Sequence, residues 1–460
     1  MRQESSLFDL SNYTTEGISS SNERAKGAPR LVYAVRDQLE FRNMTINDFI
    51  PEDHLARDIW NYVSGLDLDI VLNKIKSTDN TPGRPAIDPK ILLALWLYAN
   101  LDGVNSSRDI ETLTEMHDAY KWICGGVNVS YHSISDFRSV HGDQLNELLT
   151  QSVAILSEAG IILLDKISQD GMRVRANAGG SSFRRKETLE DHLVLATMYL
   201  EDLEKSNLNR SEKLSKEKAA KKRAAEEKLN KVQKALETLE EMRKSKKEQA
   251  KRSRESFTES DAQKLRASTT DHEARKMKMA DGGFRPAYNI QFATTNVGKA
   301  IVGVSVLNKG SDSGQAPQMI DQIVNRCKVI PTDYLLDTGY DSHKNLDELY
   351  LKYPELKIYQ PIKYNKKTDE TFEKNNNSQD TTKKKNIANS EPVKKWEDRM
   401  DSELGKKTYK MRSETAEYSN AQARNRGMQQ FRVRGIEKVS CVTLMYAIAH
   451  NMAIAFSNIL

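Results

Sequence analysis

The chain has 460 residues, of which 38% are hydrophobic and 29% are charged. That length exceeds one ordinary core, so two or three domains are expected. Lysine and arginine exceed aspartate and glutamate by 70 − 65 = 5, which permits local patches for nucleic acid without demonstrating them. No apolar run approaches the roughly 20 residues of a membrane span, so contact with a membrane is not expected.

A reducing cytoplasm is the location that the cysteine content favours. The three cysteines, Cys124, Cys327 and Cys441, are far apart and lack metal-ligand spacing. No hydrophobic stretch follows a basic start at the N-terminus, so a secretory signal is not expected.

An arm followed by a helical domain is predicted for the first 160 residues. Residues 1–30 are rich in Ser, Asn, Gly and charge, which predicts a flexible arm. From 31 to 160 the pattern is helical, with an apolar face that includes Ile91, Leu95 and Trp96.

Two short helices around Gly125-Gly126 have the pattern of a helix-turn-helix. The second helix would carry Ser133, Ser135, Arg138 and His141 to DNA. An ordinary helical bundle with a polar surface explains the same pattern, and the sequence leaves both interpretations open.

Two aspartates stand at or near predicted strands. Tyr334 to Leu336 is a short apolar run that Thr338-Gly339 breaks at once, so Asp337 stands where a buried strand meets a loop. In open α/β sheets that edge is where ligands and metals bind. Asp170, followed by Gly171, belongs to a second predicted strand region.

The remaining strands and helices predict a mixed α/β sheet built from residues 161–185 and 287–460. Near-alternating strands at 287–293 and 299–307 are joined by a hairpin turn at Asn296-Val297-Gly298. Helical patterns over 315–327 and 344–353 and a strand at 357–362 follow, so the order is not a repeated βαβ array.

Two insertions are predicted within this sheet domain. Residues 186–286 include Lys/Glu/Ala/Leu-rich segments with leucines three and four apart, which predicts a helical hairpin or coiled coil broken near 207–210. Its charges suit a solvated helical face, with contact to DNA as the alternative. Residues 363–408 form a polar Lys/Asn-rich insertion or loop. Helices are predicted from about Ser413 and from Val439 to Ile459.

Three carboxylates come from separate parts of this domain: Asp170, Asp337, and either Glu417 or Glu414. Mg²⁺ takes oxygen ligands from one or two carboxylates while keeping waters and substrate phosphates. Two such ions stabilise the attacking and leaving oxygens of an in-line phosphoryl displacement. Asp165, Asp312, Asp341 and His343 lie near the aspartates in sequence and are interpreted as neighbours of the site or as unrelated to it.

At this point the chain resembles the DDE transposases of bacterial insertion sequences, from about Gly83 to the C-terminus. The resemblance rests on Gln169-Asp170-Gly171, Tyr288-Asn289-Ile290-Gln291 and Leu336-Asp337-Thr338-Gly339-Tyr340. It implies an RNase H-like catalytic domain, preceded by an all-helical DNA-binding domain and interrupted by the helical insertion.

A C-terminal signature of Tyr, Arg, Glu and a cation is similar to Tyr409, Arg412, Glu417 and Arg424. Arg412 and Glu417 are separated by four residues where three are usual, and Arg424 stands where Lys is usual. Helical geometry leaves Glu414 open as the third carboxylate, because positions three apart share a face. Arg434-Gly435 and His450-Asn451 also resemble the closing segment of the family.

The resemblance implies a transposase that cleaves the ends of an insertion sequence and joins them to target DNA. Asp170, Asp337 and Glu417 would bind two Mg²⁺ ions, for which Mn²⁺ can substitute. Tyr409, Arg412, Arg424 and Arg426 would contact DNA. The expected partners are the terminal inverted repeats, the target DNA and a second copy of the chain, in a prokaryotic cytoplasm at the nucleoid.

Two alternatives remain open from the sequence. One is a catalytically inactive DNA-binding or coiled-coil protein, which the three acids argue against. The other is a nuclease or resolvase of the same fold that acts without strand transfer.

Overall fold

The structure, a computed structural model, describes residues 43–73, 75, 77, 85–208, 216–253, 256–340, 343–362 and 390–459. The predicted arm at 1–30, the beginning of the predicted helical domain and residues 363–389 lie outside the described residues. The chain divides into two compact units, Met1–Met44 and Thr45–Leu460, and everything below concerns the second.

The N-terminal part of this unit is helical, as the apolar periodicity predicts. Polar side chains begin several of its helices: Asp88 caps α3 ahead of Pro89, Ser106 caps α4, and Ser130 caps α6. Almost every residue of α3 is buried, so it is the central helix of this part. The elements are η1 (Ile46–Phe49), α1 (Leu55–Gly65), α2 (Asp69–Leu72), α3 (Pro89–Leu101), α4 (Ser107–Met116), α5 (Asp118–Cys124), α6 (Tyr131–Val140) and α7 (Gly142–Glu158).

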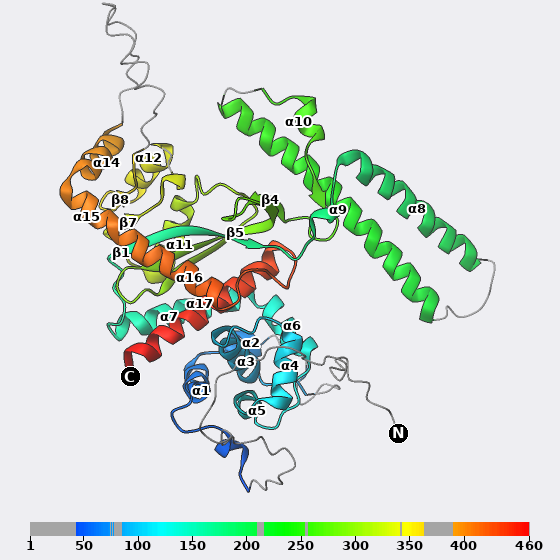
Figure 1. The fold of residues 1–460 in the computed structure, drawn as a ribbon, viewed down its shortest axis with the longest axis horizontal. Coiled ribbons are helices and arrows are strands. Elements are labelled where there is room, and N and C mark those ends of the chain that lie inside the picture. The colour runs from blue at the N-terminus through cyan, green and yellow to red at the C-terminus, as the bar shows by residue number, and fades with distance from the viewer. Residues whose placement is uncertain are drawn as a thin grey trace, which may run out of the picture. The chain divides into compact units, whose positions relative to one another are not determined.

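A mixed sheet follows, with strand order β4-β5-β1-β7-β8 and β6 paired to β5 (Figure 1). Strand β5 runs antiparallel to β1, β4 and β6, whereas β1, β7 and β8 are parallel. The strands are β1 (Lys166–Arg175), β4 (Arg275–Lys278), β5 (Phe284–Thr295), β6 (Ile301–Leu307), β7 (Asp333–Leu335) and β8 (Lys357–Tyr359), with α11 (Ala316–Cys327), η3 (Thr338–Tyr340) and α12 (His343–Lys352) between them.

The two faces of the sheet are covered by different helices. Gly303 of β6 lies against Met319 and Ile323 of α11 on one face. On the other face, Thr294 of β5 hydrogen-bonds to Ser419 of a C-terminal helix. Successive residues of a strand point to opposite faces, so Asp170 shares the second face with Phe292, its register partner. Helices near the C-terminus therefore lie over Asp170.

The C-terminal helices are α14 (Glu391–Asp401), α15 (Glu403–Arg412), the π-helical turn η4 (Ser413–Glu417), α16 (Tyr418–Asn425) and α17 (Ile436–Ile459). Helix α17 is long and apolar enough to cross a membrane by composition, but 72% of its apolar stretch is buried inside the protein. Its residues belong to the same hydrophobic core as α3 and the sheet. We therefore interpret α17 as a core helix.

A polar insertion or loop was expected over 363–408. An irregular loop is wrong for residues 391–401 and 403–408, which lie in α14 and α15. Val393, Trp396 and Met400 recur at helical spacing and are buried, and the Trp396 indole donates to the carbonyl of Gln360. Three apolar residues in an otherwise charged segment were enough to bury one side of α14.

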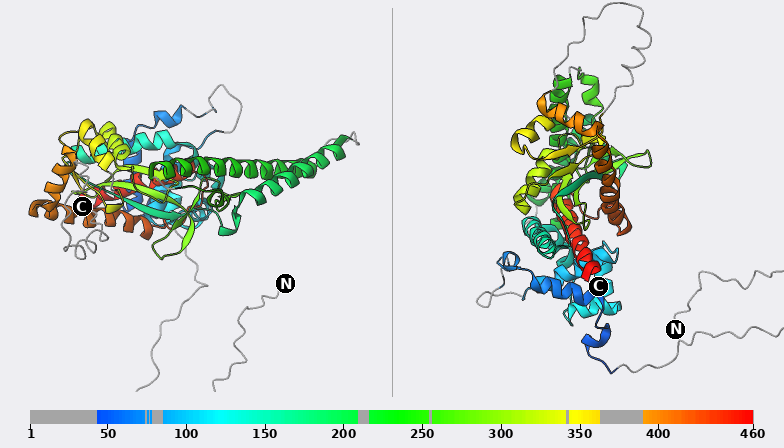
Figure 2. Two further views of the ribbon diagram at one scale, coloured as in Figure 1. Left: turned by 90° about the horizontal axis from the view of Figure 1, so that it is seen from above. Right: turned by 90° about the vertical axis from the view of Figure 1, so that its left-hand side faces the viewer.

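The segment between β1 and β5 contains two long helices, α8 (Lys186–Leu208) and α9 (Lys216–Ser253), shown together in Figures 1 and 2. They run antiparallel, because Lys186 pairs with Glu240 and Glu204 pairs with Lys222. Six buried residues form a separate small core here: Leu189, Val232, Ala235, Leu239, Leu265 and Ala267. The remaining elements are η2 (Gly180–Ser182), β2 (Phe183–Arg184), α10 (Glu259–Gln263) and β3 (Ala267–Ser268), with β2 paired to β3.

Candidate functional site

Asp170 and Asp337 lie side by side because of the register between β1 and β7. These strands are parallel, and Ser168 is the partner of Leu335. Each aspartate stands two residues after one of these partners: Asp170 after Ser168 and Asp337 after Leu335. Asp337 follows the end of β7 as predicted, whereas Asp170 lies in the middle of β1.

Backbone and side-chain donors fix both carboxylates. The Thr338 amide donates to Asp337 Oδ1 at 2.8 Å, and the Thr338 hydroxyl donates to the same oxygen at 3.1 Å. The Gly171 amide donates to Asp170 Oδ1 at 2.9 Å, and Asn420 Nδ2 of α16 donates to Asp170 Oδ2 at 3.0 Å. Each carboxylate is thus oriented before any ligand arrives.

Arg412, the last residue of α15, joins the two acids. Its Nη2 lies 3.5 Å from Asp170 Oδ1 and 3.7 Å from Asp337 Oδ2. The Arg412 side chain is 11% exposed, that of Asp170 21% and that of Asp337 48%, so the site opens to solvent beside Asp337. Burial raises the pKa of Asp170, against the lowering effect of Arg412 and of the Gly171 amide.

The π turn η4 connects Arg412 to α16. Because a π turn closes its hydrogen bonds five residues apart rather than four, Glu417 takes the position above Arg412 that residue 416 has in an α-helix. Glu414 is two positions from Arg412, and such residues do not share a helix face. Both glutamates are exposed. The turn also contains the extra residue that separates Arg412 from Glu417 in the sequence.

Glu417 does not join the two aspartates in a closed cluster. Within the described ranges, no three Asp, Glu, His or Cys side chains are grouped closely enough to hold a metal ion. Asp170 and Asp337 supply carboxylate oxygens, and Asn420, whose Nδ2 donates to Asp170, has a buried Oδ1 without a hydrogen-bond partner among the described residues. Such a set fits Mg²⁺, which accepts one or two carboxylates and completes its shell with water and phosphate.

A buried polar network on the opposite face of the sheet supports these strands, and the sequence did not predict it. Gln169 Nε2 donates to Gln291 Oε1 at 3.0 Å, and the Tyr334 hydroxyl donates to Gln169 Oε1 at 2.8 Å. The Tyr340 hydroxyl also donates to Gln291. The network ties β1, β5 and β7 to the turn that follows Asp337.

Asp312 belongs to the same face. Its Oδ1 accepts hydrogen bonds from Asn289 Nδ2 at 2.6 Å and Gln291 Nε2 at 2.7 Å. A side chain on Gly171 would come within 2.5 Å of that oxygen, so the close approach requires glycine. The interpretation of Asp312 as a neighbour of the site agrees with its place beside Gly171 and Gly339.

The four predicted DNA-contacting residues near the C-terminus lie in different surroundings. Tyr409 is partly buried near Arg412 and both aspartates, and burial raises its pKa. Arg424 is exposed on α16, at the helical spacing of seven from Glu417. Arg426 is partly buried and lies near Tyr446 and His450 of α17. Only Arg412 contacts the acids directly.

Two family models match the chain. One, described as a transposase domain (DUF772), covers residues 44–140, and the other, described as a transposase DDE domain, covers residues 367–454. Both matched models are transposase domains, and together they support a DDE transposase of an insertion sequence. No curated protein and no solved structure matches it. Members of this family act in DNA transposition, bind DNA and depend on a divalent metal, as the resemblance of the motifs implies.

The transposase-domain match spans the helices that were considered for DNA recognition. Helices α5 and α6 flank Gly125-Gly126 as expected. Yet Arg138 is only 5% exposed: its guanidinium lies over the Trp96 ring at 4.3 Å and Nη1 donates to the Asn105 carbonyl. This burial lowers the pKa of Arg138 to about 10. In this structure Arg138 stabilises the helical core, so its side chain is not exposed for the predicted contact with DNA.

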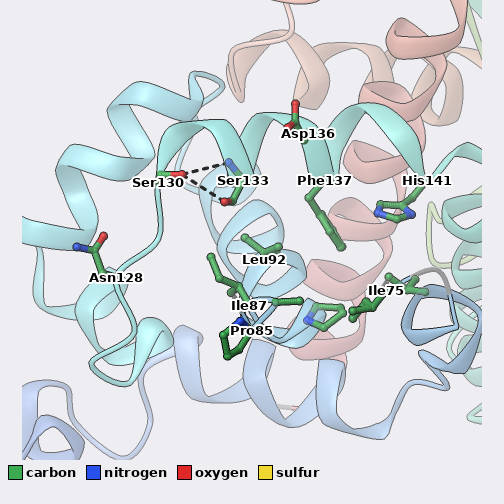
Figure 3. Close-up of a pocket in the computed structure, with 13 residues that line it drawn as sticks. Ile75, Pro85, Ile87, Leu92, Asn128, Ser130, Ser133, Asp136, Phe137 and His141 are labelled. Atoms are coloured by element: carbon green, nitrogen blue, oxygen red, sulfur yellow. Dashed lines mark hydrogen bonds between the residues drawn. The ribbon is translucent and has the colours of Figure 1, made fainter. Parts of the chain in front are cut away.

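The same helix lines a pocket of about 530 Å³ in this transposase (Figure 3). Phe137 of α6 and His141, which lies between α6 and α7, face Ile87 and Leu92 near α3. The Ser130 side chain accepts from the Ser133 amide at the rim of the pocket. Residues 78–84 adjoin this pocket in sequence and lie outside the described residues, so we assign it no ligand. Helix α6 exposes chiefly His132 and Asp136, and neither supplies a basic surface at neutral pH.

Proposed function

We propose that this transposase cleaves DNA at the ends of its insertion sequence and joins the freed 3′ ends to target DNA. The observation that carries the proposal is the pair Asp170 and Asp337, placed together by parallel strands and bridged by Arg412. Two hard oxygen donors at the open edge of a sheet, with a cation between them, suit phosphoryl transfer at a divalent metal.

The strand order supports an RNase H-like catalytic domain. Antiparallel β6, β5 and β1 precede parallel β7 and β8, with β1 at the centre and the acids on β1 and after β7. The helical segment enters between β1 and β5 through the paired strands β2 and β3. The sheet can therefore accept a long insertion without a change in its order.

Each residue of the site would have a different role. Asp170, Asp337 and Glu417 would hold two Mg²⁺ ions, or Mn²⁺ in their place, and these supply the charge that stabilises the attacking and leaving oxygens. Arg412 would hold a phosphate with its planar fork once the acids are occupied. Asn420 keeps Asp170 in place, and exposed Arg424 would contact the DNA backbone.

Several partners follow from this proposal. The helical part would recognise terminal inverted repeats, α8 and α9 would contact DNA or a second copy, and a homodimer would act on paired ends in the cytoplasm. The contacts that Arg412, Arg424 and Arg426 would make with phosphates predict binding that weakens as salt rises.

The test uses purified full-length protein, DNA carrying the ends of the element, and Mg²⁺. Asp170→Asn, Asp337→Asn and Glu417→Gln should each lower cleavage at least about a hundredfold, the scale of losing a group that acts in the transition state. Asp165→Asn is the matched control, because Asp165 is a half-exposed acid just before β1 that forms an ion pair with Lys166 at 3.9 Å. Cleavage by Asp337→Asn at the parental rate would refute the site.

Analysis of the products separates the remaining alternatives. Joined DNA in the products supports strand transfer, whereas cleaved ends without joined product indicate a nuclease. Binding of the ends with no cleavage by the parent protein in Mg²⁺ or Mn²⁺ indicates an inactive DNA-binding protein.

A further inference from the structure

Lys299, at the tip of the β5–β6 hairpin, reaches across to the π turn. Its Nζ donates to the Glu414 carbonyl at 2.8 Å, inside η4. Its backbone φ is 60°, a left-handed conformation that is strained for a non-glycine residue. Glycine would adopt this conformation without strain, so the backbone alone gives no reason for a lysine here.

Two buried residues of α17 hold the hairpin that carries Lys299. His450 Nε2 lies 3.0 Å from the Lys299 carbonyl, and a carbonyl only accepts, so this nitrogen carries the proton. Asn451 accepts from the Ile301 amide at 2.7 Å and donates to the Ile301 carbonyl at 2.9 Å. Both side chains are almost completely buried. The hairpin tip is therefore fixed on the core helix.

The π turn that Lys299 contacts lies between two residues of the candidate site. Arg412, before the turn, approaches both aspartates, and Asn420, after it, donates to Asp170. A π turn interrupts the regular ladder of helical hydrogen bonds, so a donor from outside the helix stabilises it. The ammonium group supplies a charge-assisted hydrogen bond, which is stronger than a neutral one.

We propose that Lys299 is a positioning residue for the candidate site. It holds the π turn that places Arg412 beside both aspartates and Asn420 beside Asp170. His450 and Asn451 fix the hairpin that carries Lys299. The proposal rests on the proposed function only in taking those aspartates as the reacting site. Lys299 itself contacts neither of them in the described structure.

The chain offers a matched control. Lys328, at the end of α11, is the other lysine among the described residues with a positive φ, of 55°, and it is exposed. Lys299→Met and Lys328→Met therefore remove the same charge at the same kind of backbone position. Lys299→Arg restores a cationic donor.

Hydrogen exchange of the metal-free, full-length protein tests the contact. Amides in 413–420 should exchange about tenfold faster in Lys299→Met than in the parent, whereas Lys328→Met and Lys299→Arg should match the parent. Equal protection of 413–420 in both methionine variants would overturn the proposal. If Lys299→Met does not fold, Lys299→Gln, which keeps a neutral donor on a shorter stem, is measured in its place.

Cleavage kinetics test the positioning role. With end DNA and Mg²⁺, Lys299→Met should lower kcat about tenfold with KM unchanged, and Lys299→Arg should recover most of it. Unchanged kcat in Lys299→Met, with Asp337→Asn inactive, refutes the positioning role alone. Full cleavage by Asp337→Asn refutes the proposed function, and the exchange measurement still decides whether Lys299 holds the turn.

Discussion

Arg412 determines the charge balance of the candidate site. Asp170 and Asp337 lie side by side, and burial together with repulsion from Asp337 raises the pKa of Asp170. The Arg412 guanidinium lies within 4 Å of both and offsets that repulsion without contacting any other acid in the described structure. Lysine would supply a point charge instead of a planar fork, so Arg and Lys are not equivalent at this position.

His450 gives the fold a dependence on pH. Burial, against the raising effect of the hydrogen bond to the Lys299 carbonyl and with a smaller contribution from nearby Arg426, lowers the pKa of His450 from 6.5 to about 4, so the ring is neutral at pH 7. The unfolded chain binds the proton near pH 6.5 and the folded chain does not. Stability from this residue is therefore complete above pH 6.5 and is lost as the pH falls from 6.5 towards 4.

We predict that His450→Gln reduces this loss. Glutamine keeps an amide donor for the Lys299 carbonyl and does not titrate. Between pH 7 and pH 5 the free energy of unfolding should fall by roughly 2 kcal/mol more in the parent than in the variant. Urea unfolding at the two pH values measures this difference, and equal losses would show that His450 is not the titrating group.

At the level of single residues, the sequence predicted the two acids better than the residues that surround them. Asp170 is recognisable because it precedes Gly171 in a predicted strand, and Asp337 because it stands between an apolar strand and Thr338-Gly339. Gln291 and Asp312 converge on Gly171 from separate segments, and only the pairing of β1 with β5 brings them together. Such contacts depend on register, which a single sequence does not specify.

Among the elements, the π turn explains how the helix holds one more residue than a regular α-helix would. Arg412 and Asn420 both reach Asp170 from opposite ends of η4. A regular α-helix with one residue fewer between Arg412 and Asn420 would orient these two side chains in nearly the same way as the π turn does. The usual spacing of three residues and the observed spacing of four are then alternative ways to place the same side chains.

We therefore predict that deletion of Glu414 is tolerated. The turn should close as a regular α-helix, and the variant should melt within about 5 °C of the parent. The variant should still cleave DNA ends, with Glu417 as the third carboxylate. Deletion of Gln422, in the regular part of α16, is the control: it rotates everything beyond it by about 100° and should prevent folding. Circular dichroism and the cleavage assay measure both variants.

The single-residue substitutions complete this test. Glu414→Gln should cleave as the parent does, whereas Glu417→Gln should not. A deletion variant that folds but does not cleave, together with an inactive Glu414→Gln, would assign the third carboxylate to Glu414. Failure of both deletions to fold would show that the turn does not accommodate the extra residue.

For the whole molecule, the sequence predicted the order of strands and helices along the chain, because the strands are apolar and bounded by turn residues. It missed β4, which lies within the predicted insertion 186–286 but pairs with β5 in the main sheet. It also predicted long helices between the first two strands, from leucines at helical spacing. It misjudged residues 391–408, where the charge of the segment concealed the stripe of Val393, Trp396 and Met400. Composition averaged over a segment conceals such a stripe, whereas periodicity shows it.

The α8–α9 segment is joined to the sheet at one narrow place. Arg184 pairs with Ala267, so the two ends of the segment are neighbours across β2 and β3. Its buried residues form a small core separate from the main one, which contains the sheet and α17. The sheet therefore does not depend on α8 and α9 for its own apolar burial.

We predict that the sheet folds when residues 186–265 are replaced by a short Gly/Ser linker. The ends are already adjacent, so closing a short loop between them costs little entropy. The shortened protein should keep a cooperative thermal transition within about 5 °C of the parent, measured by calorimetry. Leu239→Ala in the full-length chain is the control: it should destabilise the helical pair by about 2–5 kcal/mol and leave the main transition unchanged. A shortened protein that is unfolded at 25 °C would show that α8 and α9 support the catalytic sheet.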